Sequence, residues 1–434
     1  MKKVLIITYY WPPAGGPGVQ RWLKFVKYLP EYGVEPVIYI PENPHYPLRD
    51  VSLEAEVPEN LTVLKNAIFE PYALAGILSK KHTEKISSGI IPKEEKQGML
   101  QKLMLFIRGN FFVPDARRFW IKPSVKFLSE YLRKNKIETV ITTGPPHSVH
   151  LIGLQLKQQL NLRWIADFRD PWTQIGYHKK LKLLSAARKK HERLEREVLQ
   201  KADFLITTSF TTKAEFSEKT ATPIEVITNG YDYEKVEKKP MDEKFSLAHI
   251  GSLLSGRNPQ QLWEALQELI SENEDFAKDF ELKLIGAVGE PVLESIKAFG
   301  LEKYVALQGY VSHSEALQLQ KSAQVLLLIE IDSEETRGII PGKLFEYLVS
   351  NRPILAVGPV DSDVEKIIMH SNTGKYFLYP QKREIKEYLE QRYDEYKKGT
   401  LRSAPIGLQQ YSRKVLTEKL AKLIKQQAVH GNNH

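Results

Sequence analysis

The stretch Arg337–Leu348, which reads RGIIPGKLFEYL, decides how the fold of this chain is interpreted. The apolar run Gln324–Ile329 precedes it and predicts a buried strand, and a second run, Ile354–Val357, predicts another after it. Pro341 suits the first turn of a helix, where its missing N–H leaves no hydrogen bond unmade. Strand, helix and strand in this order predict a βα unit of a parallel sheet.

The start of this predicted helix has the features of an anion site. Gly342 and Lys343 lie where free backbone N–H groups and the positive end of the helix dipole attract anions. Glu346 follows about one turn later, and a carboxylate there can accept hydrogen bonds from the two hydroxyls of a ribose. The stretch is therefore interpreted as a nucleotide-diphosphate site. The alternative is an ordinary βα turn that binds no ligand.

The composition indicates a globular protein with more than one domain. The chain has 434 residues, of which 42% are hydrophobic and 26% charged, and it contains no cysteine. We therefore expect no disulfide and no thiolate metal site, as in a reducing cytoplasm. No apolar run approaches the roughly 20 residues that span a bilayer. The net charge of +9 fits a phosphorylated substrate or an anionic membrane, whereas basic residues interleaved with acidic ones argue against nucleic acid.

The first strand, Val4–Thr8, runs into a loop with glycines at 15, 16 and 18. Glycine permits positive φ and close approach of a ligand to the backbone, so Gly15, Gly16 and Gly18 predict an anion or sugar cradle before the next helix. The spacing is not that of the dinucleotide fingerprint. A tight connection without a ligand is the alternative.

Two further predicted strands, Glu138–Thr143 and Arg163–Asp167, end in polar clusters that contain His147, Arg169 and Asp170. Ligands of open α/β sheets bind at the carboxyl ends of strands, so these three residues are site candidates. His147 could instead cap its helix, and Arg169 with Asp170 could form a local turn.

Residues 41–120 are harder to interpret, because prolines and a mixed basic segment break the alternation of strands and helices. Leu100, Leu103, Met104 and Ile107 share one face of a predicted helix. We expect this face to pack on its own domain, and the alternative is that the segment lies on an anionic membrane.

The sequence resembles GT-B glycosyltransferases, in particular the retaining enzymes similar to glycosyltransferase family 4. The stretch Arg337–Leu348 resembles their donor site, and Glu346 matches the second glutamate of the family's E-x7-E motif. The first glutamate would fall at position 338, where this chain has Gly338. The strand Ala202–Ser209 followed by Thr228–Asp232 resembles the end of the family's first domain.

The resemblance implies a GT-B fold, an α/β architecture of two doubly wound Rossmann-like domains that face each other across a cleft. We expect an acceptor-binding domain over 1–235, with an insertion at about 41–120, and a nucleotide-sugar domain over 244–408. Residues 233–243 are the expected linker. The last helix, within 409–434, would return to the first domain.

The resemblance also implies the reaction and the role of each candidate residue. A sugar would pass from a UDP- or GDP-linked donor to a glycan or lipid-linked acceptor, in polysaccharide or cell-envelope glycan synthesis, with retention and without a metal or other cofactor. Arg257, Gly342, Lys343 and the 15–18 glycines would contact the donor diphosphate, and Glu346 the ribose. His147 and Asp170 would be catalytic, with Arg21 and Arg169 positioning sugar or acceptor. The expected location is cytoplasmic, or peripheral on the inner face of the cell membrane.

Two other functions remain open. A GT-B sugar-nucleotide epimerase would share the architecture and would need paired carboxylate acid and base groups. A catalytically degenerate subunit that only binds a nucleotide sugar would fit the loss of the glutamate at Gly338.

Overall fold

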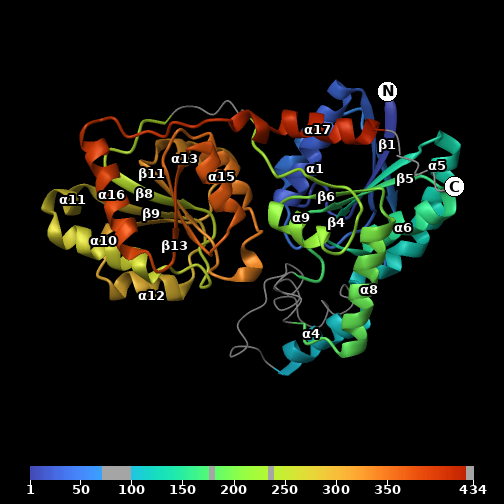
Figure 1. Cartoon of the computed structure of the whole chain (residues 1–434), viewed down its shortest axis with the longest axis horizontal. Helices are drawn as coiled ribbons and strands as arrows, with labels where there is room; N and C mark the ends of the chain where they lie inside the picture. Colours follow the sequence, from blue (N-terminus) through green and yellow to red (C-terminus); the bar gives the residue numbers. More distant parts are fainter. Residues whose placement is uncertain (71–98, 175–180, 233–238, 427–434) are drawn as a thin grey trace. The chain divides into compact units, whose positions relative to one another are not determined.

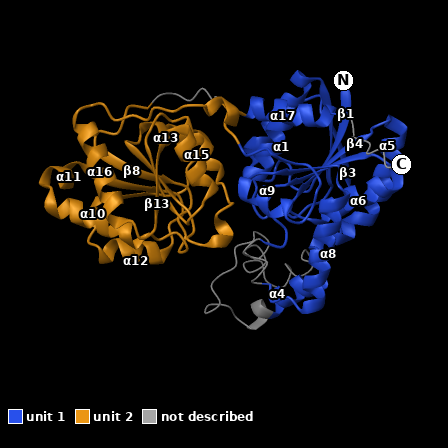
Figure 2. Cartoon of the chain, in the orientation of Figure 1, with its two compact units in different colours: residues 1–229, 413–434 blue, residues 230–412 orange. Residues whose placement is uncertain are grey.

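The computed structural model describes residues 1–70, 99–174, 181–232 and 239–426. The chain forms two compact units: unit 1 is Met1–Asn229 with Arg413–His434, and unit 2 is Gly230–Ser412 (Figure 2). The chain therefore leaves unit 1 once, builds unit 2 and returns. Unit 2 ends at Ser412, close to the expected limits at 408 and 409, but it begins at Gly230, before the expected limits at 235 and 244.

Unit 1 is built on a seven-stranded parallel sheet of order β3-β2-β1-β4-β5-β6-β7 (Figure 1). Its strands are β1 (Lys2–Thr8), β2 (Val34–Pro41), β3 (Thr62–Asn66), β4 (Thr139–Gly144), β5 (Arg163–Phe168), β6 (Phe204–Thr207) and β7 (Ile224–Val226). Its α-helices are α1 (Pro17–Tyr28), α4 (Met99–Phe111), α5 (Ile121–Asn135), α6 (Ser148–Leu160), α8 (Ser185–Lys201), α9 (Phe210–Ser217) and α17 (Arg413–Lys425).

Alternate residues of β1 face two separate cores in unit 1. Leu5 and Ile7 pack with side chains of α5, α6 and α8, whereas Val4 and Ile6 pack with α1 and α17. Both faces of the sheet are covered, which explains why every residue of the inner strands β4 and β5 is buried.

The last helix is fixed to unit 1 at its carboxyl end. Arg163 donates hydrogen bonds to the carbonyls of Leu423 (2.7 Å) and Ile424 (3.0 Å), and Lys2 Nζ donates to Ile424 O at 2.8 Å. Cations there satisfy the carbonyls that a helix end leaves without partners.

Unit 2 is built on a six-stranded parallel sheet of order β10-β9-β8-β11-β12-β13 (Figure 1). Its strands are β8 (Phe245–Ile250), β9 (Phe280–Ile285), β10 (Val305–Gln308), β11 (Val325–Ile329), β12 (Ile354–Gly358) and β13 (Gly374–Leu378). Its α-helices are α10 (Gln260–Glu272), α11 (Glu274–Asp279), α12 (Glu290–Ala298), α13 (His313–Ser322), α14 (Gly342–Leu348), α15 (Asp363–Ser371) and α16 (Lys382–Lys397).

Both sheets have the strand order of doubly wound Rossmann-like domains, with the order reversing between β1 and β4 and between β8 and β11. The two segments that lead into and out of unit 2 pair with each other, because Tyr231 N–H donates to Tyr411 O at 3.1 Å. The ends of unit 2 are therefore neighbours.

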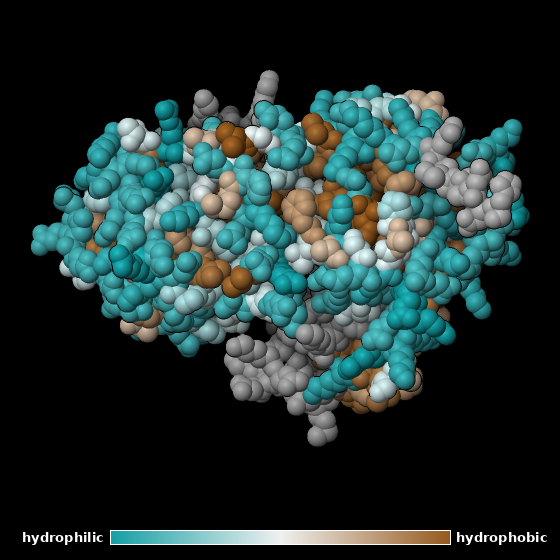
Figure 3. Space-filling view, viewed as in Figure 1, coloured by the Kyte–Doolittle hydropathy of each residue, from teal (hydrophilic) through white to brown (hydrophobic). Residues whose placement is uncertain are grey.

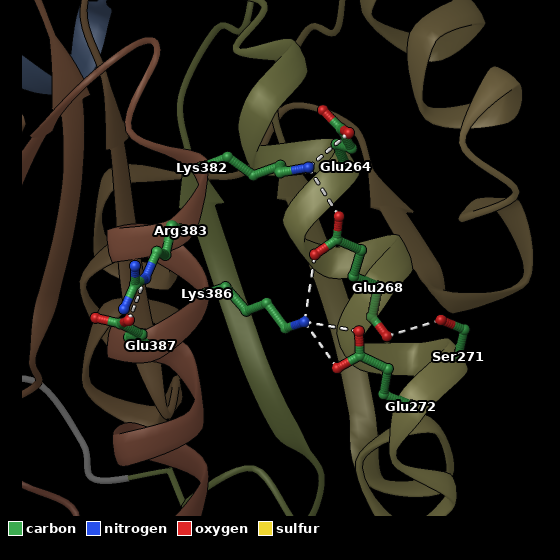
Figure 4. A network of polar contacts seen from close by, with 8 residues as sticks. All are labelled: Glu264, Glu268, Ser271, Glu272, Lys382, Arg383, Lys386 and Glu387. Atoms are coloured by element: carbon green, nitrogen blue, oxygen red, sulfur yellow. Dashed lines mark hydrogen bonds and ion pairs between the residues drawn. The ribbon is translucent and has the colours of Figure 1, made fainter.

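Charged side chains join α10 and α16 on the surface of unit 2. Lys382 contacts Glu264 and Glu268, each at 2.8 Å, and Lys386 contacts Glu268 and Glu272 (Figure 4). These pairs are solvated, so we expect them to fix the register of the two helices more than to stabilise the fold.

The expected packing of residues 100–107 is only partly right. A helix forms there, α4, in which Leu105 and the predicted Met104 pack against Leu181, whereas Leu103 and Ile107 are 52% and 39% exposed. The side chain of Leu100 lies outside the described residues. Elsewhere, the face of the molecule in Figure 3 is mostly hydrophilic, with hydrophobic side chains in small groups. None of the helices in the described ranges is long and apolar enough to cross a membrane.

A buried ion pair ties α1 to the sheet of unit 1. Asp167 on β5 contacts Arg21 at 3.1 Å, with 0% and 2% of the two side chains exposed. Its other oxygen accepts from Trp22 Nε1 and Thr143 Oγ1, both at 2.8 Å.

We expect Asp167→Asn to destabilise unit 1 by about 3–5 kcal/mol, because it leaves a buried guanidinium without a counter-ion. The measurement is chemical unfolding followed by tryptophan fluorescence, since of the six tryptophans all except Trp263 lie in unit 1. The control is Glu35→Gln, which removes an exposed pair with Lys3 and should cost under about 1 kcal/mol. Equal losses for the two variants would contradict this role of Asp167.

Candidate functional site

The candidate site in unit 2 lies where the strand order of its sheet reverses. The adjacent strands β8 and β11 continue into separate loops, which begin at Gly251 and Glu330. Loops that diverge in this way leave a crevice at the carboxyl edge of a sheet, the usual ligand position in doubly wound domains.

Lys343 reaches the carboxyl end of β8. Its Nζ donates to Ile250 O at 2.9 Å and lies 3.1 Å from His249 Nε2. Gly251, at φ +117°, leaves the space for it, because a Cβ there would lie 3.0 Å from Nζ. No carboxylate of the described residues lies within ion-pair distance of Lys343, so its charge is available to an anionic ligand.

Burial and the nearby charge of Arg257 lower the pKa of Lys343 to about 7. The pKa of His249 falls well below its usual value through burial and the charge of Lys343. His249 is therefore neutral. Its Nδ1 lies 3.1 Å from Leu327 O and carries the hydrogen, which leaves Nε2 to accept from the ammonium.

Arg257 supplies a second cation in the same region. Its backbone N–H closes a turn to Leu254 O at 2.8 Å, and burial lowers its pKa against the opposing effect of Tyr379 and Glu330. Within the described ranges its guanidinium makes no hydrogen bond and no ion pair. The charge of Arg257 helps to lower the pKa of Lys343, so the two cations lie within electrostatic reach of each other, and a bound diphosphate would relieve this unfavourable interaction.

Glu330 lies beside these cations at the end of β11 and is only 5% exposed. Its Oε2 accepts from Ser362 Oγ and Tyr376 OH, each at 2.8 Å, while Oε1 is buried without a hydrogen-bond partner among the described residues. Burial raises the pKa of Glu330 to about 7.

The helix that was expected to bind an anion through its N-terminus is shorter than predicted. It begins at Gly342 and ends at Leu348, and Pro341 is its N-cap residue, not part of its first turn. Seven residues give a small dipole, so the favourable potential comes from Lys343 and Arg257 instead.

Glu346 on α14 is held by two residues of α13. His313 Nε2 lies 2.9 Å from its Oε1, and Gln320 Nε2 donates to its Oε2 at 2.8 Å. The Glu346 side chain remains 22% exposed and so is open to a ligand.

The glycine loop of unit 1 has three different local constraints. A Cβ on Gly15 would lie 3.1 Å from Leu48, and Gly16 is the N-cap of α1 with φ +108° and open space around it. A Cβ on Gly18 would collide with the Arg169 guanidinium. Gly18 is therefore needed for the approach of Arg169, and contact of the loop with a donor phosphate stays a prediction.

His147, Arg169 and Asp170 all lie at the carboxyl ends of β4 and β5. The His147 ring is buried and stacks on Trp172 with ring centres 4.8 Å apart. It does not cap α6 with its side chain, where Asp115 Oδ2 accepts from Ser148 N–H at 2.8 Å. Arg169 donates to the carbonyls of Gly144 and Pro145.

Burial raises the pKa of Asp170 against the opposing charge of Arg169. Arg21, expected to position a sugar or acceptor, is 4% exposed and bonds Asp167 and Thr228 O. Its observed contacts are those of a structural ion pair. The catalytic and positioning roles given to these residues of unit 1 stay predictions.

Sequence reasoning missed His249, Glu330, His313 and Gln320. His249 and Glu330 left one usable signal, a polar residue within or directly after an apolar strand run. His313 and Gln320 left none, because their importance depends on the tertiary contact of α13 with α14.

Comparisons with known proteins bear on the fold. No protein-family model matches the chain, and a search of curated proteins found no match. Among solved structures, Anabaena HepE in complex with UDP covers 98% of this chain and 99% of its own at 12% identity and a TM-score of 0.58. WaaG, described as a glycosyltransferase involved in lipopolysaccharide biosynthesis, covers 98% and 100% at 13% identity and a TM-score of 0.54.

A chain described as a candidate UDP-N-acetylglucosamine 2-epimerase from Listeria monocytogenes covers 98% and 96% at 12% identity and a TM-score of 0.53. At such identities the likeness concerns the fold. With its two parallel-sheet Rossmann-like units, the chain has the GT-B fold, and this expectation is confirmed.

We expect Lys343 to react with acetic anhydride at lower pH than an ordinary lysine, because only the neutral amine is nucleophilic. Its labelling, followed by mass spectrometry, should be half-maximal near pH 7, the value to which its pKa is lowered. Lys382 is the internal control, since its pKa is raised by Glu264 and Glu268. Labelling of both lysines with the same pH profile would contradict the environment described for Lys343.

We expect Glu330→Gln to stabilise the protein more at pH 8 than at pH 5. The folded pKa of about 7 lies above the unfolded value, so the stability linked to Glu330 is present at low pH and lost as pH rises through 7. Removing the buried charge should raise the free energy of unfolding by about 1–3 kcal/mol at pH 8, as measured by chemical unfolding. Glu387→Gln on exposed α16 is the control, and an equal effect at both pH values would refute the assignment.

Proposed function

We propose that the protein is a glycosyltransferase that uses a nucleotide-diphosphate sugar, and that unit 2 binds the donor. The observation that supports this most is the pair of cations, Lys343 and Arg257, at the switch point of the unit 2 sheet. Among the described residues neither has a carboxylate ion-pair partner, and Glu346 lies on the same short helix as Lys343. Two phosphates would supply the negative charge that Lys343 and Arg257 lack, and a ribose would supply hydroxyl donors to Glu346.

The proposed chemistry is electrostatic. When the bond between the anomeric carbon and the diphosphate oxygen breaks, negative charge develops on the leaving diphosphate. Lys343 and Arg257 stabilise that charge, and their fixed positions in a partly buried site make the stabilisation larger than in water. Charge on the diphosphate would in turn raise the lowered pKa of Lys343 and keep its ammonium protonated.

The donor is proposed to be UDP- or GDP-linked, as expected from the resemblance. The structure of HepE, a protein of similar fold, in complex with UDP supports a UDP-linked donor. The acceptor is proposed to be a glycan or lipid-linked glycan of the cell envelope, with transfer by retention and without a metal or other cofactor. His147 and Asp170, with Arg169, are proposed to act on the sugar or acceptor.

The same proposal includes a cytoplasmic location with peripheral contact at the inner face of the cell membrane. The support is α4, where Leu103 and Phe111 are 52% and 64% exposed on a helix that also carries Arg108. Exposed apolar residues on a helix that also carries a basic residue suit an anionic bilayer surface.

A nucleotide-sugar epimerase is the second candidate, favoured by the Listeria structure of the same fold. It would need an acid and base pair of carboxyls at the sugar. Epimerisation of a free nucleotide sugar without any acceptor would identify it, whereas a transferase should at most hydrolyse the donor slowly.

The test is a thermal-shift and calorimetry screen with UDP, GDP, ADP and their sugars. A ligand that binds only the folded protein must raise the melting temperature. For the nucleotide that binds, we expect Arg257→Ala and Lys343→Met each to weaken affinity by about tenfold to a hundredfold, the range of a hydrogen bond to a charged group.

The matched control is Arg383→Ala, which removes a cation from the exposed surface of α16 and should leave affinity unchanged. Failure of every nucleotide to bind, or an equal loss in the control, would refute the donor site. Binding without any donor hydrolysis or transfer would instead indicate the catalytically degenerate subunit.

A further inference from the structure

The α13 helix places two hydrogen-bond donors on one acceptor of the neighbouring helix. His313 Nε2 and Gln320 Nε2 lie 2.9 and 2.8 Å from the two oxygens of Glu346. An ionised carboxylate only accepts hydrogen bonds, so both nitrogens must carry hydrogens, which fixes the histidine tautomer and the amide orientation.

The two donors differ in their surroundings. Gln320 is 2% exposed and is therefore rigid, whereas the His313 side chain is 44% exposed at the first position of α13. One donor fixes the carboxylate from the protein interior and the other from the solvent side. The plane of the carboxylate is thereby set before any ligand arrives.

The hydrogen-bond capacity that is left on Glu346 is specific. Each carboxylate oxygen has about two lone-pair sites, and α13 uses one on each oxygen. One site per oxygen remains, and the side chain is 22% exposed. A vicinal diol, with two adjacent O–H donors, matches this remainder, whereas a single hydroxyl leaves one site unused.

We propose that His313 and Gln320 are positioning residues that orient Glu346 for both hydroxyls of a ribose, so that the site selects ribonucleoside over 2′-deoxyribonucleoside diphosphates. This inference rests on the proposed function, because it requires that unit 2 binds a nucleotide diphosphate. It adds two residues that do not themselves contact the ribose, and a preference for ribose over 2′-deoxyribose that depends on them.

The proposal predicts that separate groups of residues bind the diphosphate and the ribose. Lys343 and Arg257 hold the diphosphate whatever is attached to it, and α13 acts only through the carboxylate at the ribose. Loss of a charge-assisted hydrogen bond to the 2′-hydroxyl should weaken binding by about tenfold to a hundredfold. Inorganic pyrophosphate has no ribose, so changes on α13 should not affect its binding.

The experiment compares, by calorimetry, UDP with 2′-deoxy-UDP and with inorganic pyrophosphate, and repeats the comparison with GDP and 2′-deoxy-GDP. In the unmodified protein we expect the ribonucleotide to bind about tenfold to a hundredfold more tightly than its deoxy form. His313→Ala and Gln320→Met should reduce that ratio severalfold and leave pyrophosphate affinity unchanged. His313→Gln, which can place an N–H at the same distance, should restore most of the ratio.

The matched control is His370→Ala, which removes an exposed histidine of α15 whose Nδ1 lies 2.6 Å from Lys366 O. An unchanged ribose preference in both α13 variants, or an equal loss of nucleotide and pyrophosphate binding, would overturn the positioning role. Equal affinity of the unmodified protein for ribose and deoxyribose forms would overturn the selectivity. Binding of no nucleotide at all would refute the proposed function itself.

Discussion

The arrangement of unit 2 depends on one ammonium group that is held by neutral acceptors. Lys343 contacts a backbone carbonyl and the ring of His249, and His249 must be uncharged to accept that contact. Gly251 has no side chain where the lysine passes, and Arg257 adds a like charge close by. Burial and the charge of Arg257 raise the energy of the cation without a ligand, and the two neutral acceptors offset this only in part. A site of this kind favours an incoming anion because the protein itself leaves the charge uncompensated.

Much of the fold could be predicted because its central strands are long apolar runs covered on both faces. The predicted strand Val4–Thr8 lies within β1, and the predicted strand Ile354–Val357 lies within β12. The strands β3 and β13 were missed. They are edge strands of their sheets, and β3 is only partly buried, so their sequences lack the continuous apolar run.

The site was predictable to the extent that its chemistry lies in single residues after strands. Lys343 and Arg257 follow that rule, and the structure brings them within electrostatic reach of each other. The features that could not be predicted are contacts between residues far apart in the sequence. They are the close approach of Arg169 to Gly18, the burial of Glu330, and the hydrogen bonds from α13 to Glu346. These depend on which elements become neighbours, and spacing along the chain does not encode that.

The pairing of Tyr231 with Tyr411 makes unit 2 an insertion in the loop between β7 and α17. During synthesis all of unit 2 emerges from the ribosome before α17, whose apolar residues complete one core of unit 1. Unit 2 has all its strands at that stage and can fold first. The Val4 face of the unit 1 sheet, in contrast, stays incomplete until α17 is made, so it is the surface that would need protection from aggregation in the nascent chain.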